Sequence, residues 1–305
     1  MKFRTWPAWI HRVVAVWAVA YAAVHAFWLL TGTAVPFAFR FTMPAWAQVA
    51  LALAALAALT RLIPVVTPVF VVATFGAPIE FVALLGGDGS GAVSLILLLM
   101  NIAGAGLLVA ATVVRRRRGR CPRCGEGHPP PWDAPFLHPP ATPASPRTRV
   151  VVYVAMCGIL PWAVTKTIWT LGGDALGMTA ARWHELNAGG SGTTRGLAAV
   201  GIDFTVLAAL LACFLILGLT HRWGMVFPLL RRRVPRLLPL IPAWLAGFTL
   251  FLYGTALVVG GLVTTGWFWM VEFGGLAFGG LGAGLLVGAR SYARRTRPVC
   301  AVQGR

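Results

Sequence analysis

The chain has 305 residues, of which 58% are hydrophobic and only 11% are charged. This apolar content is higher than that of a soluble domain of the same length and indicates an integral membrane protein. The formal net charge of +18 would suit nucleic-acid binding only if the basic residues formed one patch on a soluble fold. They are instead distributed among predicted membrane loops, so no nucleic-acid partner is expected.

Eight apolar runs are long enough to cross a hydrocarbon core of roughly 30 Å as helices. They cover approximately residues 13–31, 45–61, 62–86, 92–114, 150–172, 197–219, 238–261 and 266–289. The first run follows a basic stretch, and no small-residue cleavage site comes after it, so we expect a retained helix rather than a signal peptide. The expected fold class is an all-α integral membrane protein with eight transmembrane helices.

The basic residues predict the topology of these helices. Of the 26 lysines and arginines, 22 fall in the two tails and in alternate loops that share one face. Only Arg40, Arg182 and Arg195 fall in the opposite loops, and Lys166 falls within a span. Because cytoplasmic loops carry the excess of basic residues, both termini are expected in the cytoplasm of a plasma-membrane protein. The arginine-rich face is expected to contact anionic lipids.

A repeated sequence predicts two tandem units. GAGLLV begins at Gly104 and again at Gly282, and LIP begins at Leu62 and again at Leu240, both 178 residues later. Chance recurrence in apolar sequence could explain any single match, but ordered matches at a constant offset favour duplication. We expect two four-helix units of the same orientation, at 1–114 and 150–305, related by an axis along the membrane normal. Residues 115–149 form a proline- and arginine-rich cytoplasmic linker.

This linker contains a CxxC motif, Cys121-Pro-Arg-Cys124, which is typical of a zinc knuckle. His128 and His138 could supply two further ligands, and Cys300 could replace one of them. A structural zinc ion is the cofactor that this set would suit. The alternative is a reduced, unliganded thiol pair in a flexible loop, because the sequence has no second CxxC.

Five ionisable residues within the spans form a predicted polar membrane cluster: His25, Glu80, Lys166, Asp203 and Glu272. Counted along each helix, all five lie within roughly 12 Å of the outer surface. Ionisable groups are costly in a membrane and usually face a bundle interior, although some of these could lie at the headgroups. We expect Lys166 to pair with Asp203.

The segments YAAVHAFW and WAVTKTIW place His25 and Lys166 at equivalent points, each three residues before a tryptophan. Both side chains are therefore expected to point toward one shared polar region.

We expect two glycine-rich segments to have structural roles and not to bind ligands. Residues 189–196 lack the lysine and the preceding strand of a phosphate-binding loop and are expected to form a flexible surface loop. The glycines between Gly274 and Gly284 have GxxxG spacing, which predicts a close-packing helix face.

Three features resemble those of uncharacterised multi-pass membrane proteins of high-GC Gram-positive bacteria. They are the arginine-rich ends of the last helices, the THRWG segment at 220–224, and the HxxW and KxxW pairs. That resemblance covers the spans of both units and implies no activity.

A transporter or permease is the first functional hypothesis, because duplicated units and buried charges are typical of such proteins. The second is a noncatalytic scaffold or sensor whose linker binds a cytoplasmic partner. The third is an enzyme acting on a lipid-linked substrate at the outer leaflet, although no nucleophile, base and orienting group occur at recognisable spacing.

Overall fold

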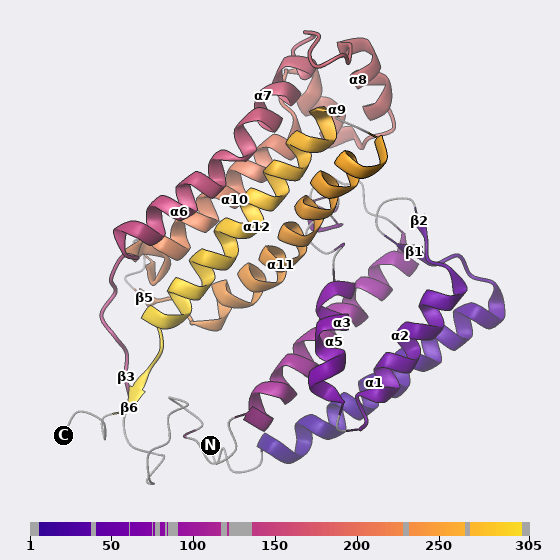
Figure 1. Cartoon of the computed structure of the whole chain (residues 1–305), viewed down its shortest axis with the longest axis vertical. Coiled ribbons are helices and arrows are strands. Elements are labelled where there is room, and N and C mark those ends of the chain that lie inside the picture. Colours follow the sequence, from indigo (N-terminus) through magenta and orange to yellow (C-terminus); the bar gives the residue numbers. More distant parts are fainter. Residues whose placement is uncertain are drawn as a thin grey trace. The chain divides into compact units, whose positions relative to one another are not determined.

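The computed structural model describes residues 6–37, 41–60, 62–74, 76, 80–82, 84, 91–116, 121, 136–227, 232–265 and 269–300. The chain divides into two compact units, both largely helical (Figure 1). The first unit comprises residues 1–77, 90–136 and 300–305, and the second comprises residues 78–89 and 137–299. They are described separately below.

The first unit is a bundle of four named helices: α1 (Trp6–Thr31), α2 (Ala45–Ala57), α3 (Ile63–Ala73) and α5 (Ala92–Arg116). A two-stranded antiparallel sheet, β1 (Pro36–Phe37) with β2 (Phe41–Thr42), follows α1. Helix α1 packs against α2 and α5, and α3 packs against α5. The core between them includes Trp17, Tyr21 and Phe70, whose rings meet at centroid distances of 4.8–5.3 Å.

The second unit is built around its last helix. Its helices are α6 (Pro146–Cys157), α7 (Ile159–Thr170), α8 (Ala180–Asn187), α9 (Gly192–Ala199), α10 (Phe204–Thr220), α11 (Leu237–Gly260) and α12 (Trp269–Arg295). A 3₁₀ turn (η3, Arg222–Gly224) follows α10, and a π-helical turn (η4, Gly261–Thr265) extends α11. Helix α12 packs against α6, α7, α10 and α11.

The described residues also form two further two-stranded sheets. Strand β4 (Val226–Phe227) pairs antiparallel with β5 (Arg232–Arg233) in the second unit. Strands β3 (Phe136–Leu137) and β6 (Val299–Cys300) form the remaining two-stranded sheet.

Among the residues that the structure describes, five helical segments are long and apolar enough to cross a membrane: α1, α5, α6 with α7, α11 and α12. A sixth is obtained if α9 and α10, which meet at 93°, form one broken span. Helices α2 and α3 are apolar but have 13 and 11 residues, so each reaches only about 20 Å or less of the roughly 30 Å core. The protein is therefore an all-α, polytopic membrane protein.

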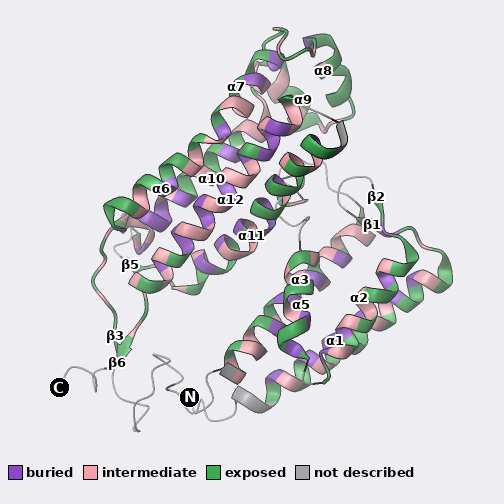
Figure 2. Ribbon diagram, viewed as in Figure 1, coloured by how far each residue is buried: buried purple, intermediate pink, exposed green. Residues whose placement is uncertain are grey.

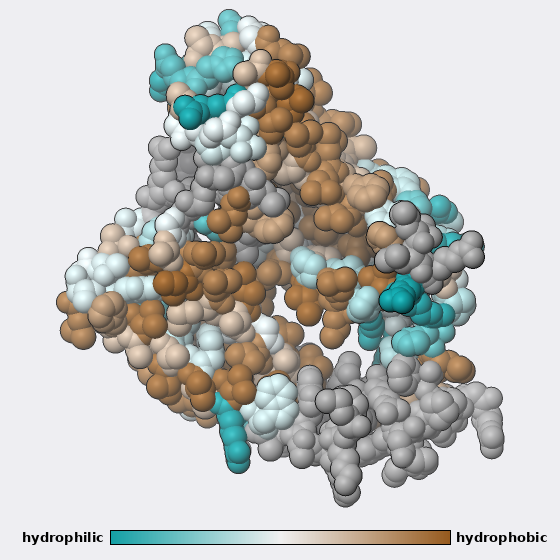
Figure 3. All heavy atoms as spheres, turned by 180° about the vertical axis from the view of Figure 1, so that it is seen from behind, coloured by the Kyte–Doolittle hydropathy of each residue, from teal (hydrophilic) through white to brown (hydrophobic). Residues whose placement is uncertain are grey.

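The surface of the second unit is divided between apolar and polar regions. Large hydrophobic side chains are exposed along its long helices, as at Leu210 of α10 and Leu237 of α11 (Figure 2). Hydrophilic side chains gather at the end that carries α8 and α9 (Figure 3). A belt of exposed apolar side chains between polar ends is what lipid contact requires.

The glycines of α12 form a close-packing face, as their spacing predicted. A Cβ atom on Gly254 of α11 would lie 2.1 Å from the backbone nitrogen of Gly279, and one on Gly280 would lie 2.3 Å from the carbonyl oxygen of Ala155. Only glycine permits such an approach between helix backbones. Their lack of side chains therefore lets α11 and α6 pack directly against α12.

The two GAGLLV copies make different contacts. A Cβ on Gly104 would collide with the ring of Trp17 on α1, whereas a Cβ on Gly282 would collide with the backbone of Phe251 on α11. The first glycine thus faces the first helix of its unit, and the second glycine faces the third long helix of its own. Equivalent packing of these two residues is not observed.

The expectation of a flexible loop is wrong for residues 192–196, which lie in α9, whereas residues 189–191 lie between α8 and α9. Ser191 accepts a hydrogen bond from the Thr194 backbone N–H and caps α9, which begins at Gly192. A serine at this position is a strong helix-start signal, because it satisfies an N–H group that the helix leaves free.

Candidate functional site

Two of the five ionisable residues in the predicted cluster, Lys166 and Asp203, form an ion pair with each other. Lys166 lies on α7, four residues before its end, and its Nζ is 3.5 Å from Asp203 Oδ2. The two side chains are only 13% and 9% exposed. The predicted pair is therefore confirmed, and it is largely buried.

Asp203 is held in place by its role as the N-cap of α10. Its Oδ1 accepts hydrogen bonds from the backbone N–H groups of Thr205 (2.8 Å) and Val206 (3.2 Å). The other carboxylate oxygen remains available for Lys166. Gly201, with φ +79°, supplies the left-handed residue in the bend between α9 and α10. The cap and the bend together fix the carboxylate at the start of α10.

Thr205 connects the two charges. Lys166 Nζ donates to Thr205 Oγ1 at 2.6 Å, and the same hydroxyl donates to Asp203 Oδ1. Two indole rings cover the ammonium group, with centroids 4.6 Å (Trp162) and 4.9 Å (Trp183) from Nζ. Such cation–π contacts stabilise a cation that is removed from water. The lysine is thus enclosed by one carboxylate, one hydroxyl and two aromatic faces.

Sequence reasoning missed Thr205 and Trp183. The Asp-Phe-Thr order at 203–205 is a readable capping signal that would have placed Thr205 beside the carboxylate. Trp183 lies on α8, a short helix capped by Thr179, and its ring packs in a tilted arrangement against that of Trp169 on α7, at a centroid distance of 5.0 Å. Its position depends on how this segment folds back onto α7, which has no local sequence signal.

Glu272 lies in the second unit, in the first turn of α12, and is only 4% exposed. Its Oε1 has no hydrogen-bond partner in the part of the chain that the structure describes. A Cβ on Gly261, the first residue of the π-helical turn, would lie 2.4 Å from this oxygen. The carboxyl group is therefore packed against backbone at an irregular turn, and π-helical turns are frequent at functional sites.

His25 lies in the first unit and is fully buried on α1. Neither of its ring nitrogens has a hydrogen-bond partner among the described residues, and the same holds for Oε1 of the buried Gln48. Its ring lies 4.6 Å from that of Tyr21, four residues earlier. Lys166 likewise lies 4.6 Å from the ring of Trp162, four residues earlier, a neighbour that any helix provides. The equivalence of His25 and Lys166 therefore remains a prediction.

The remaining member of the predicted cluster, Glu80, lies in a short helical stretch at residues 80–82, grouped with the second unit. His25 is grouped with the first unit. Whether all five residues share one polar region therefore remains a prediction.

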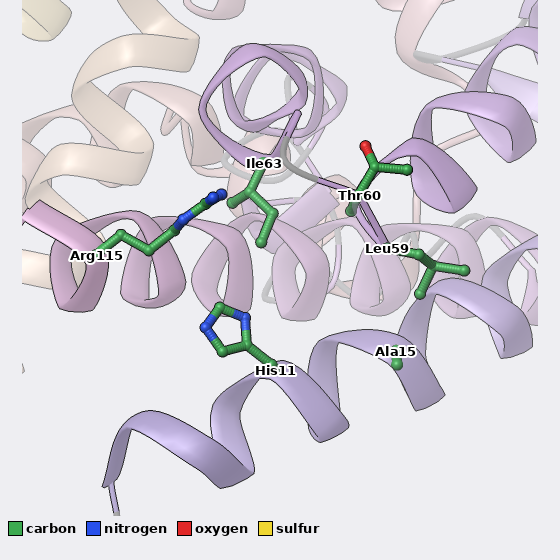
Figure 4. A pocket seen from close by; sticks show the side chains of 7 residues that line it. His11, Ala15, Leu59, Thr60, Ile63 and Arg115 are labelled. Atoms are coloured by element: carbon green, nitrogen blue, oxygen red, sulfur yellow. The ribbon is translucent and has the colours of Figure 1, made fainter.

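A cavity of about 300 Å³ lies in the first unit. The side chains of His11 on α1 and Arg115 on α5 point toward this space, and Ile63 of α3 forms part of its wall (Figure 4). None of its lining residues in the described part of the chain is acidic. Two basic groups from different helices can together bind an anionic group.

The predicted metal ligands are described only in part. Cys124 and His128 lie outside the described residues, and His138 follows strand β3. Cys121 and Cys300 are both buried, with their sulfur atoms 3.7 Å apart. Within the described ranges, no group of three or more histidine, cysteine, aspartate or glutamate side chains is placed to hold a metal ion.

Comparisons of the chain with protein-family models, with curated proteins and with solved structures found no match.

Proposed function

We propose that the protein is a proton-coupled transporter or permease of the plasma membrane, with its polar site in the outer third of the bilayer. The observation that carries this proposal is the buried carboxyl group of Glu272, which has an oxygen without a partner among the described residues. A carboxyl group in a membrane span needs a proton or a cation to neutralise it. Residues of this kind typically carry protons through pumps and transporters.

The Lys166–Asp203 pair supports the same site. It lies near the end of α7 and the start of α10, and Glu272 lies near the start of α12. These helix ends belong to the end of the second unit that carries α8 and α9 (Figure 1). At the opposite helix ends, Arg222 follows α10, Arg236 precedes α11 and Arg295 is the last residue of α12. Because arginine-rich ends face the cytoplasm, the polar residues are assigned to the outer side.

Proton flux into liposomes tests this function directly. The purified protein is reconstituted, a membrane potential is imposed, and internal acidification is followed with a pH-sensitive dye. The wild-type protein should acidify the lumen, and Glu272→Gln should abolish the flux because an amide cannot release a proton. Glu185→Gln is the matched control, since Glu185 is exposed and pairs with Arg182 on α8. A wild-type rate equal to that of empty liposomes would refute proton transport.

The topology proposed here comprises eight spans, with α2 and α3 as short members and both termini in the cytoplasm. Two tandem units related by duplication remain part of this proposal. The duplication is supported by similar packing of the last helix in each unit. Helix α5 packs against α1 and α3 in the first unit, and α12 packs against α6 and α11 in the second unit. The different contacts of Gly104 and Gly282 limit the similarity to helix order. Reporter fusions after Arg149 and at Arg305 should both indicate the cytoplasm, and an outside signal at either point would refute the topology.

A scaffold or sensor role is the second candidate. The contact between Cys121 of the linker and Cys300 favours it, because the two residues lie 179 positions apart in the chain and their sulfur atoms are 3.7 Å apart. A cytoplasmic protein that binds residues 115–149 would be the partner. Cross-linking from this linker in intact cells tests the alternative: a specific adduct together with absent proton flux would favour the scaffold.

A further inference from the structure

The residues around the Lys166 ammonium group have the chemistry of a binding site for organic cations. The indole centroids of Trp162 and Trp183 lie 4.6 and 4.9 Å from Nζ, within the roughly 6 Å of a cation–π contact. Asp203 supplies a negative charge, and the Thr205 hydroxyl accepts a hydrogen bond from Nζ. Aromatic faces recognise free ammonium groups, such as those of choline and methylated lysine, in the same way. The four residues around Lys166 are named the cation cage.

Lys166 occupies the cation cage without a close bond to the carboxylate. Nζ lies 3.5 Å from Asp203 Oδ2, whereas charge-assisted hydrogen bonds from ammonium to carboxylate are about 2.7–2.9 Å long. The shorter contact of the ammonium group, at 2.6 Å, is with Thr205. Asp203 is held in place through its other oxygen, which accepts from two backbone N–H groups of α10. The carboxylate would therefore keep its position if another cation replaced the lysine.

Both the lysine and one wall of the cation cage are able to move. The Lys166 side chain is a flexible four-carbon chain that ends in a compact charge. Three of the cage residues belong to α7 and α10 or cap α10, but Trp183 belongs to α8. Helix α8 has eight residues, of which Ala180 is the buried one. Outward movement of α8 would open the cage at the end of the unit that the charge pattern assigns to the outside.

We propose that the cation cage binds the ammonium group of a small organic cation and that Lys166 occupies the cage when this ligand is absent. The ligand's ammonium group takes the place of Nζ between the two indole rings, beside the Asp203 carboxylate. The charge in the cage stays constant, because one monovalent cation replaces another. A soluble amine and the ammonium headgroup of a lipid share this chemistry. The role of the cation as a transported substrate rests on the proposed function, whereas its binding to the cage does not.

Amine labelling of the wild-type protein measures the displacement of Lys166. The sequence contains two lysines, Lys2 and Lys166, so peptide mass spectrometry follows each one separately. The protein is reconstituted in nanodiscs of phosphatidylglycerol, which has no ammonium group, and treated with an acetylating reagent. Tetramethylammonium chloride, which does not consume the reagent, should raise the labelling of Lys166 severalfold and saturably. Labelling of Lys2 should stay constant, and sodium chloride at the same concentration should change neither lysine.

Two comparisons identify the source of the ligand and the walls that bind it. Raised labelling of Lys166 in phosphatidylcholine nanodiscs without added solute would assign the cage to a lipid headgroup, and unchanged labelling there would assign it to a soluble cation. Trp183→Leu should lose most of the response to tetramethylammonium, whereas Trp183→Phe should retain it because an aromatic face remains. Leu186→Ala is the matched control on α8, since Leu186 is exposed, and it should respond like the wild-type protein.

A rescue experiment tests the cage without the resident lysine. In Lys166→Ala, n-propylammonium supplies the missing part of the side chain and should raise the melting temperature, whereas uncharged 1-propanol should not. The double variant with Asp203→Asn should show no rescue. Lys166 labelling in the wild-type protein that neither tetramethylammonium nor phosphatidylcholine raises would overturn the proposal, even if rescue occurs, because the pair would then be structural only. Proton flux enters none of these measurements, so a failure of proton transport leaves their outcome unchanged.

Discussion

Lys166 and Asp203 form a buried ion pair that joins the end of α7 to the start of α10, with Nζ 3.5 Å from Oδ2. The carboxylate has two roles, since its other oxygen caps α10 through backbone N–H groups. The ammonium group also has several partners, namely the Thr205 hydroxyl and two indole rings. Removing either charge therefore has consequences for both helices.

Replacing Lys166 with methionine should destabilise the protein strongly, because it leaves the Asp203 carboxylate buried without its cation. Removal of one partner from a buried ion pair typically costs about 3–5 kcal/mol. Asp203→Asn should leave the helix cap intact, since asparagine is also a good N-cap residue. The double variant should lose less stability than the sum of the two single variants. Thermal unfolding of the detergent-solubilised protein measures these differences.

If the Lys166–Asp203 pair instead carries protons or solute, the same variants should change transport activity and leave thermal stability unchanged. Lys166→Met and Asp203→Asn would then melt at the wild-type temperature and lose proton flux in liposomes. Full additivity of the two stability losses would contradict an energetic coupling between the charges.

Gly254 should tolerate no side chain. Its Cβ would lie 2.1 Å from the Gly279 backbone nitrogen, so Gly254→Ala must push α11 and α12 apart. Overpacking of this kind costs about 1–3 kcal/mol. The control is Gly279→Ala, whose Cβ would lie 3.8 Å from Gly254 in ordinary contact. Equal thermal stabilities of the two variants would show that the two backbones do not approach as closely as described.

Hydropathy predicts where the helices lie, but not where an apolar run is interrupted. Helices α5 and α12 match their expected spans closely, since each run is long and free of capping signals. The expected boundary between the runs at 45–61 and 62–86 is observed near Thr60, whose hydroxyl donates to the Ala57 carbonyl oxygen. The run at 197–219 instead bends at Gly201 and Asp203. Turn chemistry therefore overrides hydropathy in this second run.

Part of the site could be predicted, because a charged group buried in a membrane raises the free energy of the fold unless it has a partner. An isolated ammonium group in a membrane is expensive, which is why Asp203 could be assigned to Lys166. The sequence offered Cys300 only as an alternative ligand beside Cys121, because spacing along a chain says little about contacts between segments 179 residues apart. Trp183 was missed for the same reason.

Arg295 should contribute to stability as well as to topology. Its guanidinium group donates to the Leu219 carbonyl oxygen near the end of α10 and to that of Thr142. Hydrogen bonds from a charged group contribute about 1.5–3 kcal/mol, so Arg295→Ala should unfold at a lower temperature. Arg295→Lys keeps the charge but cannot donate from two nitrogens, and should be intermediate. Arg290→Ala, at an exposed position on the same helix, should change stability by less than about 0.5 kcal/mol.

The cavity lined by His11 and Arg115 should bind the phosphate group of an anionic lipid. The two side chains come from α1 and α5 and point toward the same space of about 300 Å³ (Figure 4). Arg115 belongs to the arginine-rich stop at the end of α5, which the charge pattern assigns to the cytoplasmic face. Each basic residue near an anionic membrane surface contributes about 1 kcal/mol to lipid binding, or about fivefold in affinity. Arg115→Gln should therefore lower the retention of phosphatidylglycerol about fivefold, as measured by native mass spectrometry.

Arg12 provides the matched control for this experiment. It follows His11 on α1, carries the same charge as Arg115, and is exposed outside the cavity. Arg12→Gln should therefore retain phosphatidylglycerol at close to the wild-type level, while His11→Gln should lower retention. Phosphatidylcholine, whose headgroup has no net charge, should bind the wild-type protein and all three variants equally weakly. An equal loss of phosphatidylglycerol from Arg12→Gln and Arg115→Gln would mean that the lipid responds to overall charge and not to the cavity.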